Sequence, residues 1–158
     1  MIHRTAVAVV MVATTVAFVP MLVAADPTEE KPPQWADVDP SYAIGKRAIE
    51  LKDWATAIRA LSSVADRDRN ADVQNYLGYA YRNLGQLDRA LHHYDRALEL
   101  DPRHRGAHEY IGEAFLIVNN VPKAEEHLAA LGRICQTPCE EYLDLKKAIE
   151  EYRKRAAK

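Results

Sequence analysis

The sequence lacks the motifs by which most enzyme classes are recognised. It contains no Gly-rich phosphate loop, no His-Glu-x-x-His pair and no serine in a nucleophile elbow. Outside its two cysteines, no residues form a recognisable catalytic set. We therefore predict that the chain is not an enzyme and that it has no catalytic residues, no metal site and no cofactor.

A basic excess is also missing. The 158 residues include 21 Lys and Arg against 23 Asp and Glu, which gives a formal net charge of −2. Proteins that bind nucleic acid neutralise phosphates with clustered Lys and Arg and are usually basic. The charge balance therefore argues against a nucleic-acid partner.

The only long apolar run lies at the N-terminus. Arg4 is followed by apolar residues from Ala6 to Val19 and by a small-residue exit at Val23-Ala24-Ala25. This layout is typical of a secretory signal and predicts residues 1–25 as a signal peptide that is cleaved before Asp26. The alternative is an uncleaved anchor in the inner membrane, because the stretch from Thr5 to Ala25 approaches the roughly 20 residues that span a bilayer.

The segment 26–39 is rich in proline and acidic residues and has little apolar content to bury. Such a composition predicts a flexible tether between the signal and the folded part. Trp35 is the exception within it. A lone aromatic in a tether either packs against the domain or waits for a partner, and we favour packing.

From Pro40 onward the pattern is helical, and it repeats. Small residues mark the repeat: the glycines are 33 and 34 residues apart, and an alanine follows each of them by 12, in the pairs Gly45 and Ala57, Gly78 and Ala90, and Gly112 and Ala124. The best copy, Val73 to Pro102, carries Leu77-Gly78, Tyr81, Ala90, Tyr94, Ala97 and Pro102. These residues resemble the tetratricopeptide repeat at almost every signature position.

The resemblance implies an all-α fold, a right-handed α-solenoid of three helix pairs within residues 40–136. The pairs are expected at about 38–70, 71–104 and 105–136. Asn119 replaces glycine in the turn of the third pair, because asparagine tolerates the left-handed conformation that Gly85 supplies in the second.

The last segment, 137–158, is predicted to be a capping helix. Thr137 is expected as its N-cap, with Pro138 at the first helical position and Glu140 completing a capping box. An apolar stripe follows at Tyr142, Leu145, Ile149 and Tyr152. We expect this stripe to dock onto the third pair, with a partner helix or a dimer contact as the alternatives.

The two cysteines, Cys135 and Cys139, stand at the joint before this helix. Their C-x-x-x-C spacing differs from the C-x-x-C of thioredoxin-like proteins, and His127 is the only histidine near them in sequence. In an oxidising compartment a structural disulfide is favoured. A redox-active pair and a metal ligand pair remain alternatives. His92 and His93 are set aside as metal ligands because adjacent residues diverge on a helix. His104 and His108 are four apart and could share a helix face, but His104 lies at the helix entry and no carboxylate completes a known catalytic spacing.

For function, the resemblance implies a binding scaffold whose concave groove is lined by the first helix of each repeat. The matching positions that we predict as partner-binding residues are Tyr42, Lys46, Glu50, Asn75, Tyr79, Arg82, Asn83, Glu109, Glu113 and Leu116. Tyrosines offer rigid contact area, and a peptide of mixed charge fits better than a strongly acidic one, because Glu109 and Glu113 oppose acid.

Our primary hypothesis is a periplasmic adaptor that binds a protein or peptide and helps to assemble an envelope complex, with weak self-association as a further option. The mature form is expected to have no membrane span. The alternative hypothesis is a thiol-redox or metal-handling factor that uses Cys135 and Cys139 on the repeat platform.

Overall fold

The structure is a computed structural model that describes residues 39–157, apart from residues 66 and 68. The predicted signal peptide at 1–25 and all but the last residue of the predicted tether lie outside the described residues. Within the described range, no helix combines the length and the apolar content that a bilayer crossing requires.

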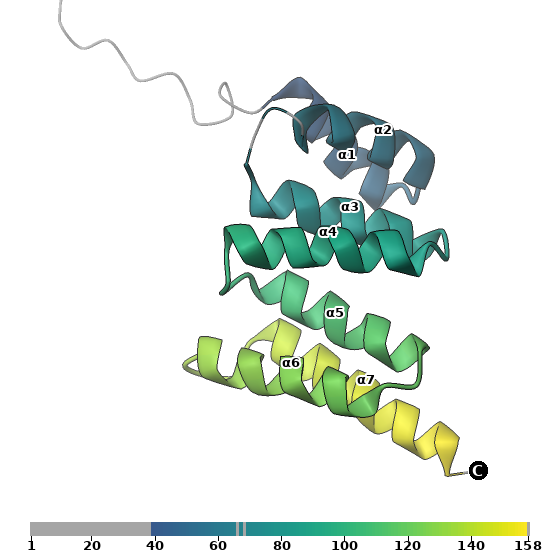
Figure 1. Ribbon diagram of the computed structural model, residues 1–158, viewed down its shortest axis with the longest axis vertical. Coiled ribbons are helices and arrows are strands. Elements are labelled where there is room, and N and C mark those ends of the chain that lie inside the picture. The colour runs from purple at the N-terminus through teal and green to yellow at the C-terminus, as the bar shows by residue number, and fades with distance from the viewer. Residues whose placement is uncertain (1–38, 66, 68, 158) are drawn as a thin grey trace, which may run out of the picture. The chain divides into compact units, whose positions relative to one another are not determined.

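Seven helices and no strand form in the described part of the chain (Figure 1). They are α1 (Pro40–Glu50), α2 (Trp54–Ala65), α3 (Ala71–Asn83), α4 (Leu87–Leu100), α5 (Arg105–Ile117), α6 (Val121–Ile134) and α7 (Glu140–Ala156). The first six form three antiparallel pairs, and each pair packs on the next, α2 against α3 and α4 against α5. The predicted all-α fold class is confirmed.

Polar caps and left-handed residues set the helix boundaries. The Asn70 side chain accepts a hydrogen bond from the Asp72 amide at 2.8 Å and so begins α3, and the Asn120 side chain caps α6 in the same way. Gly85 has a φ of 73° in the turn after α3, and Asn119 has a φ of 60° in the turn after α5, as predicted from their residue types. Lys52 adopts the same conformation after α1, with a φ of 57°.

Two glycines make the close approaches within the first two pairs. A Cβ added to Gly45 would lie 2.5 Å from Leu61, and one added to Gly78 would lie 2.5 Å from Tyr94. No side chain other than hydrogen fits at such separations. The small residues are therefore required by the distance between the paired helices.

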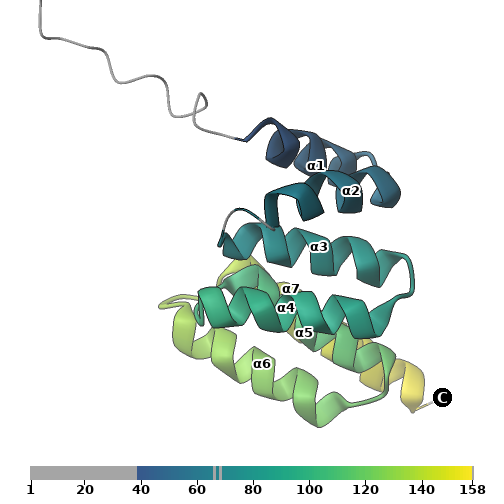
Figure 2. The same cartoon turned by 45° about the horizontal axis from the view of Figure 1, so that its top comes forward.

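The third pair uses its glycine differently. A Cβ added to Gly112 would lie 2.5 Å from the Leu145 side chain, which belongs to α7. Leu145 is fully buried, and Ile149 is 2% exposed. Both pack with Leu116 of α5 and with Ala124 and Leu131 of α6. The apolar stripe of α7 thus docks onto the third pair, and α7 lies alongside α5 and α6 in both views (Figures 1 and 2).

The start of α7 differs from the prediction. Cys139 is the N-cap and makes no side-chain capping bond, so the capping box of Thr137 and Glu140 was wrong. The sulfur atoms of Cys135 and Cys139 lie 2.06 Å apart, at disulfide distance. This link closes a five-residue loop that includes Thr137 and Pro138, and the helix begins only after the loop.

Candidate functional site

The predicted binding positions lie on α1, α3 and α5, the first helices of the three pairs. Tyr42, Lys46 and Glu50 lie on α1, Asn75, Tyr79, Arg82 and Asn83 on α3, and Glu109, Glu113 and Leu116 on α5. The structure brings them together in three groups of different character. We refer to the surface that these helices share, which the repeat resemblance predicts to be concave, as the concave surface.

The N-terminal group holds two tyrosines and a lysine. The rings of Tyr42 on α1 and Tyr76 on α3 lie 6.3 Å apart between centroids. The exposed Lys46 ammonium lies 5.8 Å from the first ring and 5.9 Å from the second. A cation within about 6 Å of two aromatic faces is attracted by the ring quadrupoles, and an exposed cation remains hydrated at the same time. Lys46 is therefore a positioned, solvent-accessible positive charge.

The central group is a cluster of aromatic rings around a mostly buried arginine. The Arg82 guanidinium lies 5.4 Å from the ring of Tyr79 and 5.2 Å from that of Tyr110. Its Nη1 donates to the Glu113 carboxylate, and only 14% of the Arg82 side chain is exposed. The Trp54 ring borders the cluster and meets the Tyr79 ring edge to face, with 5.8 Å between the centroids. Arg82 is thus already paired within the protein.

The third group is acidic, and its ionisation differs from what the sequence suggests. Burial raises the pKa of Glu109 to about 8, and the nearby Glu113, Asp144 and Glu141 carboxylates add to the shift. At neutral pH the Glu109 carboxyl is mostly protonated, while Glu113 is neutralised by its ion pair with Arg82. The acidic repulsion that we predicted from these two glutamates is therefore weakened.

Two of the predicted polar contacts point elsewhere. Asn75 is only 6% exposed, and its Oδ1 has no hydrogen-bond partner. Its Nδ2 lies 3.1 Å from the place that a Cβ on Gly106 would occupy, so it fills the contact between α3 and α5. The Asn83 side chain donates to the Tyr79 carbonyl of its own helix at 2.8 Å. Neither amide is presented freely to a ligand.

A cleft opens where α3, α5 and α7 meet. It has a volume of about 270 Å³. Its lining residues are Arg82, Glu113, Leu116, Ile117, Ala148, Glu151, Tyr152 and Arg155. We call it the C-terminal cleft.

Three of these eight residues were predicted as partner-binding positions, and the other five were missed. Ile117, the last residue of α5, is 60% exposed. The other four come from α7, where Ala148, Glu151, Tyr152 and Arg155 follow the helical spacing i, i+3, i+4 and i+7. That spacing was a usable signal. It was not used because only the apolar stripe of α7 was considered, for docking or for a contact with a partner helix or second copy, and the groove was predicted from the first helices of the repeats alone.

Polar contacts as well as the apolar stripe hold α7 against the array. The Tyr152 hydroxyl donates to the Asn119 side chain at 2.7 Å. Arg153 pairs with Glu125 of α6, and Arg105 Nε lies 3.5 Å from the Glu141 carboxylate. The left-handed turn residue Asn119 thus also positions the helix that forms one wall of the cleft.

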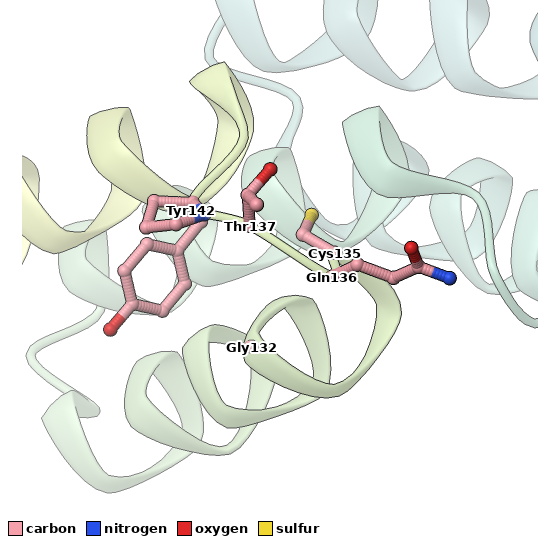
Figure 3. A pocket seen from close by; sticks show the side chains of 6 residues that line it. Gly132, Cys135, Gln136, Thr137 and Tyr142 are labelled. Carbon is pink, nitrogen blue, oxygen red and sulfur yellow. The ribbon is translucent and has the colours of Figure 1, made fainter.

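The joint before α7 contains a second hollow, of about 220 Å³ (Figure 3). Gly132, Cys135, Gln136, Thr137, Pro138 and Tyr142 line it. No carboxylate or imidazole is among them. Over the described residues as a whole, no three His, Cys, Asp or Glu side chains gather in a way that would hold a metal ion.

The histidines that were considered as metal ligands have structural roles. The His104 side chain caps α5 by accepting from the Ala107 amide at 3.1 Å. His108 and His127 face each other with their Nδ1 atoms 3.0 Å apart. His127 therefore pairs with another helix and not with the cysteines.

The geometry defines a class: an all-α array of helix pairs with a terminal helix packed beside the last pair. The family model of the tetratricopeptide repeat matches residues 71–104, which span α3 and α4. The chain thus contains a tetratricopeptide repeat at α3 and α4, and the fold of the array resembles that of solved tetratricopeptide repeat structures. A comparison with curated proteins finds no significant match.

Three solved structures illustrate the similarity of fold. SycD, the type III secretion translocator chaperone of Yersinia enterocolitica, has a TM-score of 0.67 at 15% identity, over 79% of this chain and 92% of its own. The first tetratricopeptide domain of Spaghetti (RPAP3), bound to the HSP90 peptide SRMEEVD, has a TM-score of 0.65 at 15% identity, over 75% and 91%. PcrH in complex with the chaperone binding region of PopD has a TM-score of 0.65 at 18% identity, over 73% and 90%.

Proposed function

We propose that this chain binds a segment of a partner protein on its concave surface, and that the C-terminal cleft is the anchoring point. The cleft carries the proposal, because it is a recess between three helices that combines apolar and charged side chains. Two structures of similar fold support it, since one holds an HSP90 peptide and the other holds a region of PopD. The proposed role is binding, without catalysis.

The lining indicates the chemistry of the segment. Leu116, Ile117 and Tyr152 offer a site for one apolar side chain, while Glu151 and Arg155 place a charge of each sign at the rim. The neutralised Glu113 and the mostly protonated Glu109 repel acidic groups only weakly. We infer an apolar anchor flanked by residues of mixed charge, and acidic neighbours are tolerated.

We place this activity in the periplasm. The N-terminal signal pattern supports export, and a cysteine pair at disulfide distance fits an oxidising compartment. Cell fractionation with N-terminal sequencing tests this part: a soluble periplasmic chain that begins at Asp26 is expected. A cytoplasmic chain, or one retained in the membrane with residues 1–25 intact, contradicts it.

Selection of peptides from a random display library, followed by calorimetric titration of the selected peptide, tests the cleft. Ile117→Asp places a charge in the apolar part of the cleft lining, and Leu143→Asp is the matched control. Leu143 is 51% exposed on α7 and does not line the cleft. We expect Ile117→Asp to weaken binding at least about tenfold, which corresponds to roughly 1.4 kcal/mol, and the control to bind as the wild type does.

Equal affinities for the two variants, or no peptide selected at all, contradict the assignment. Arg82 is a poor choice for this test. Its removal leaves the Glu113 carboxylate, 27% exposed, without its partner, and a folding defect then mimics a binding defect.

A further inference from the structure

The outer face of the first helix pair carries an exposed apolar hollow. It has a volume of about 430 Å³. Most of its lining is Ala43, Ile44 and Ala48 of α1 and Leu51 directly after it, with Thr56 of α2. Ile44 is 54% exposed and Leu51 is 64% exposed, the latter the largest value among the exposed large apolar residues of the described part. We call it the N-terminal hollow.

The position of the hollow in the array explains why no other helix covers it among the described residues. Each later pair has an earlier pair packed on the side that faces the N-terminus, but α1 and α2 have none among the described residues. Terminal units of helical repeats normally carry a polar outer face for solubility. Here the only charged groups that line the hollow are Arg47 and Asp53, one of each sign.

We propose that Trp35 of the preceding segment docks in the N-terminal hollow and caps that end of the array. Trp35 lies outside the described residues, and it is the only aromatic residue in 26–39. An indole removes roughly 150–250 Å² of surface from water on burial, and it needs an apolar recess of this kind. The exposed Ile44 and Leu51 offer one.

The length of the connecting chain permits the docking. Four residues lie between Trp35 and Pro40, where α1 begins, and the five residue steps that join the two reach at most about 17 Å. Ile44 lies only about 6 Å along the helix from Pro40, at about 1.5 Å per residue. The chain must reverse between the two, and Asp37, Asp39 and Pro40 are residues that favour turns.

The first described residue fixes the point from which the chain returns. The Asp39 side chain accepts from the Ser41 amide at 2.7 Å and from Arg67 Nη2 at 2.9 Å. These bonds tie the start of α1 to the region that follows α2.

A group tethered to the chain also occupies the hollow more readily than a free partner does. A short linker gives the attached group an effective concentration in the millimolar range. A second copy of the chain or a free partner helix must compete with that concentration. The hollow is therefore assigned to the chain's own Trp35.

Tryptophan fluorescence of the protein as purified from the cell tests the docking. The chain has two tryptophans, so a Trp54→Phe background leaves Trp35 as the only one. We expect blue-shifted emission and quenching by acrylamide severalfold weaker than for free tryptophan. Adding Ile44→Asp is expected to shift the emission to the red and to restore quenching, while Leu143→Asp changes neither.

A second measurement needs no change at Trp54. Methyl NMR of Ile44 and Leu51 is expected to show ring-current shifts that disappear in Trp35→Ala and persist in Trp54→Phe. Solvent-like emission of Trp35 with unshifted methyl signals overturns the proposal. Shielding that appears only as the protein concentration rises also overturns it, and assigns the hollow to a second copy.

Discussion

The two ends of the helical array differ in how their apolar side chains are covered. At the C-terminal end, α7 inserts Leu145 against Gly112, buries Ile149 and turns charged residues outward. At the N-terminal end, Ile44 and Leu51 stay exposed among the described residues. A helix added at one end thus both seals the array and supplies a wall of the cleft, whereas the other end presents an open apolar face.

The largest expected effect separates the two ends directly. Leu145→Ala removes a fully buried side chain and leaves a cavity next to Gly112, against which that side chain packs. We expect this change to lower the free energy of unfolding by about 3 kcal/mol. Leu51→Ala, at the 64% exposed position, is expected to cost no more than about 0.5 kcal/mol. Urea denaturation measures both. Equal losses contradict the contrast between a packed and an open end.

The covalent link at the C-terminal joint is expected to contribute less. Closing a loop of about five residues stabilises by roughly 2 kcal/mol on the chain-entropy model. Denaturation of the oxidised protein and of Cys135→Ser with Cys139→Ser measures the difference. Thiol titration before and after mild reductant checks that the pair is oxidised. Rapid reduction at the potential of known oxidoreductases favours the redox alternative instead.

Between about pH 6.5 and 4, acid is expected to act on the later helices more than on the first pair. Burial lowers the pKa of His93 and of His127 to about 4, from an ordinary value near 6.5, and α1 and α2 contain no histidine. The unfolded chain therefore binds protons that the folded chain does not, and stability falls as the pH drops from about 6.5 to 4.

Replacing His127 with Gln is expected to remove part of that pH dependence, about 1 to 2 kcal/mol after allowance for partial exposure. Thermal melts between pH 7 and pH 4 measure it. The control is His92→Gln, at an exposed position on α4. A pH dependence unchanged by His127→Gln contradicts the account of the His108 and His127 contact.

The smallest effect lies where α7 meets α5. The raised pKa of Glu109 means that the unfolded carboxyl ionises near pH 4.5 and the folded one near 8, so stability declines as the pH rises through that window. Glu109→Gln is expected to remove the decline and to stabilise the protein at pH 8 by about 1 kcal/mol. Melts at pH 5 and pH 8 check the sign. Equal effects at both pH values contradict the burial of this carboxyl.

Much of the fold follows from residue types in the sequence. The recurrence of Gly45, Gly78 and Gly112 predicted the three pairs, because each small residue marks a close helix approach. The left-handed Asn119 was predicted for the same kind of local reason. The start of α7 was not, because Thr137 is a good N-cap locally and a link between residues 135 and 139 overrides that preference.

The site was less predictable than the fold. The sequence assigns side chains to a helix face, but the partner of each depends on distances between helices. Arg82 was interpreted as a free ligand contact, and the structure pairs it with Glu113, 31 positions away. Asn75 was placed in the groove by repeat position and is instead buried at a helix contact. The contribution of α7 required knowing that it lies beside α5.

The central claim is that α7 is both a cap and a wall of the peptide-binding cleft. Calorimetric titration of a selected peptide against Ala148→Gln, with Lys147→Gln as the control, tests it most directly. Ala148 lines the cleft and Lys147 is exposed outside it, so the longer side chain fills the recess only in the first variant. We predict at least about a tenfold loss of affinity for Ala148→Gln and none for the control. Wild-type affinity in both variants contradicts the claim.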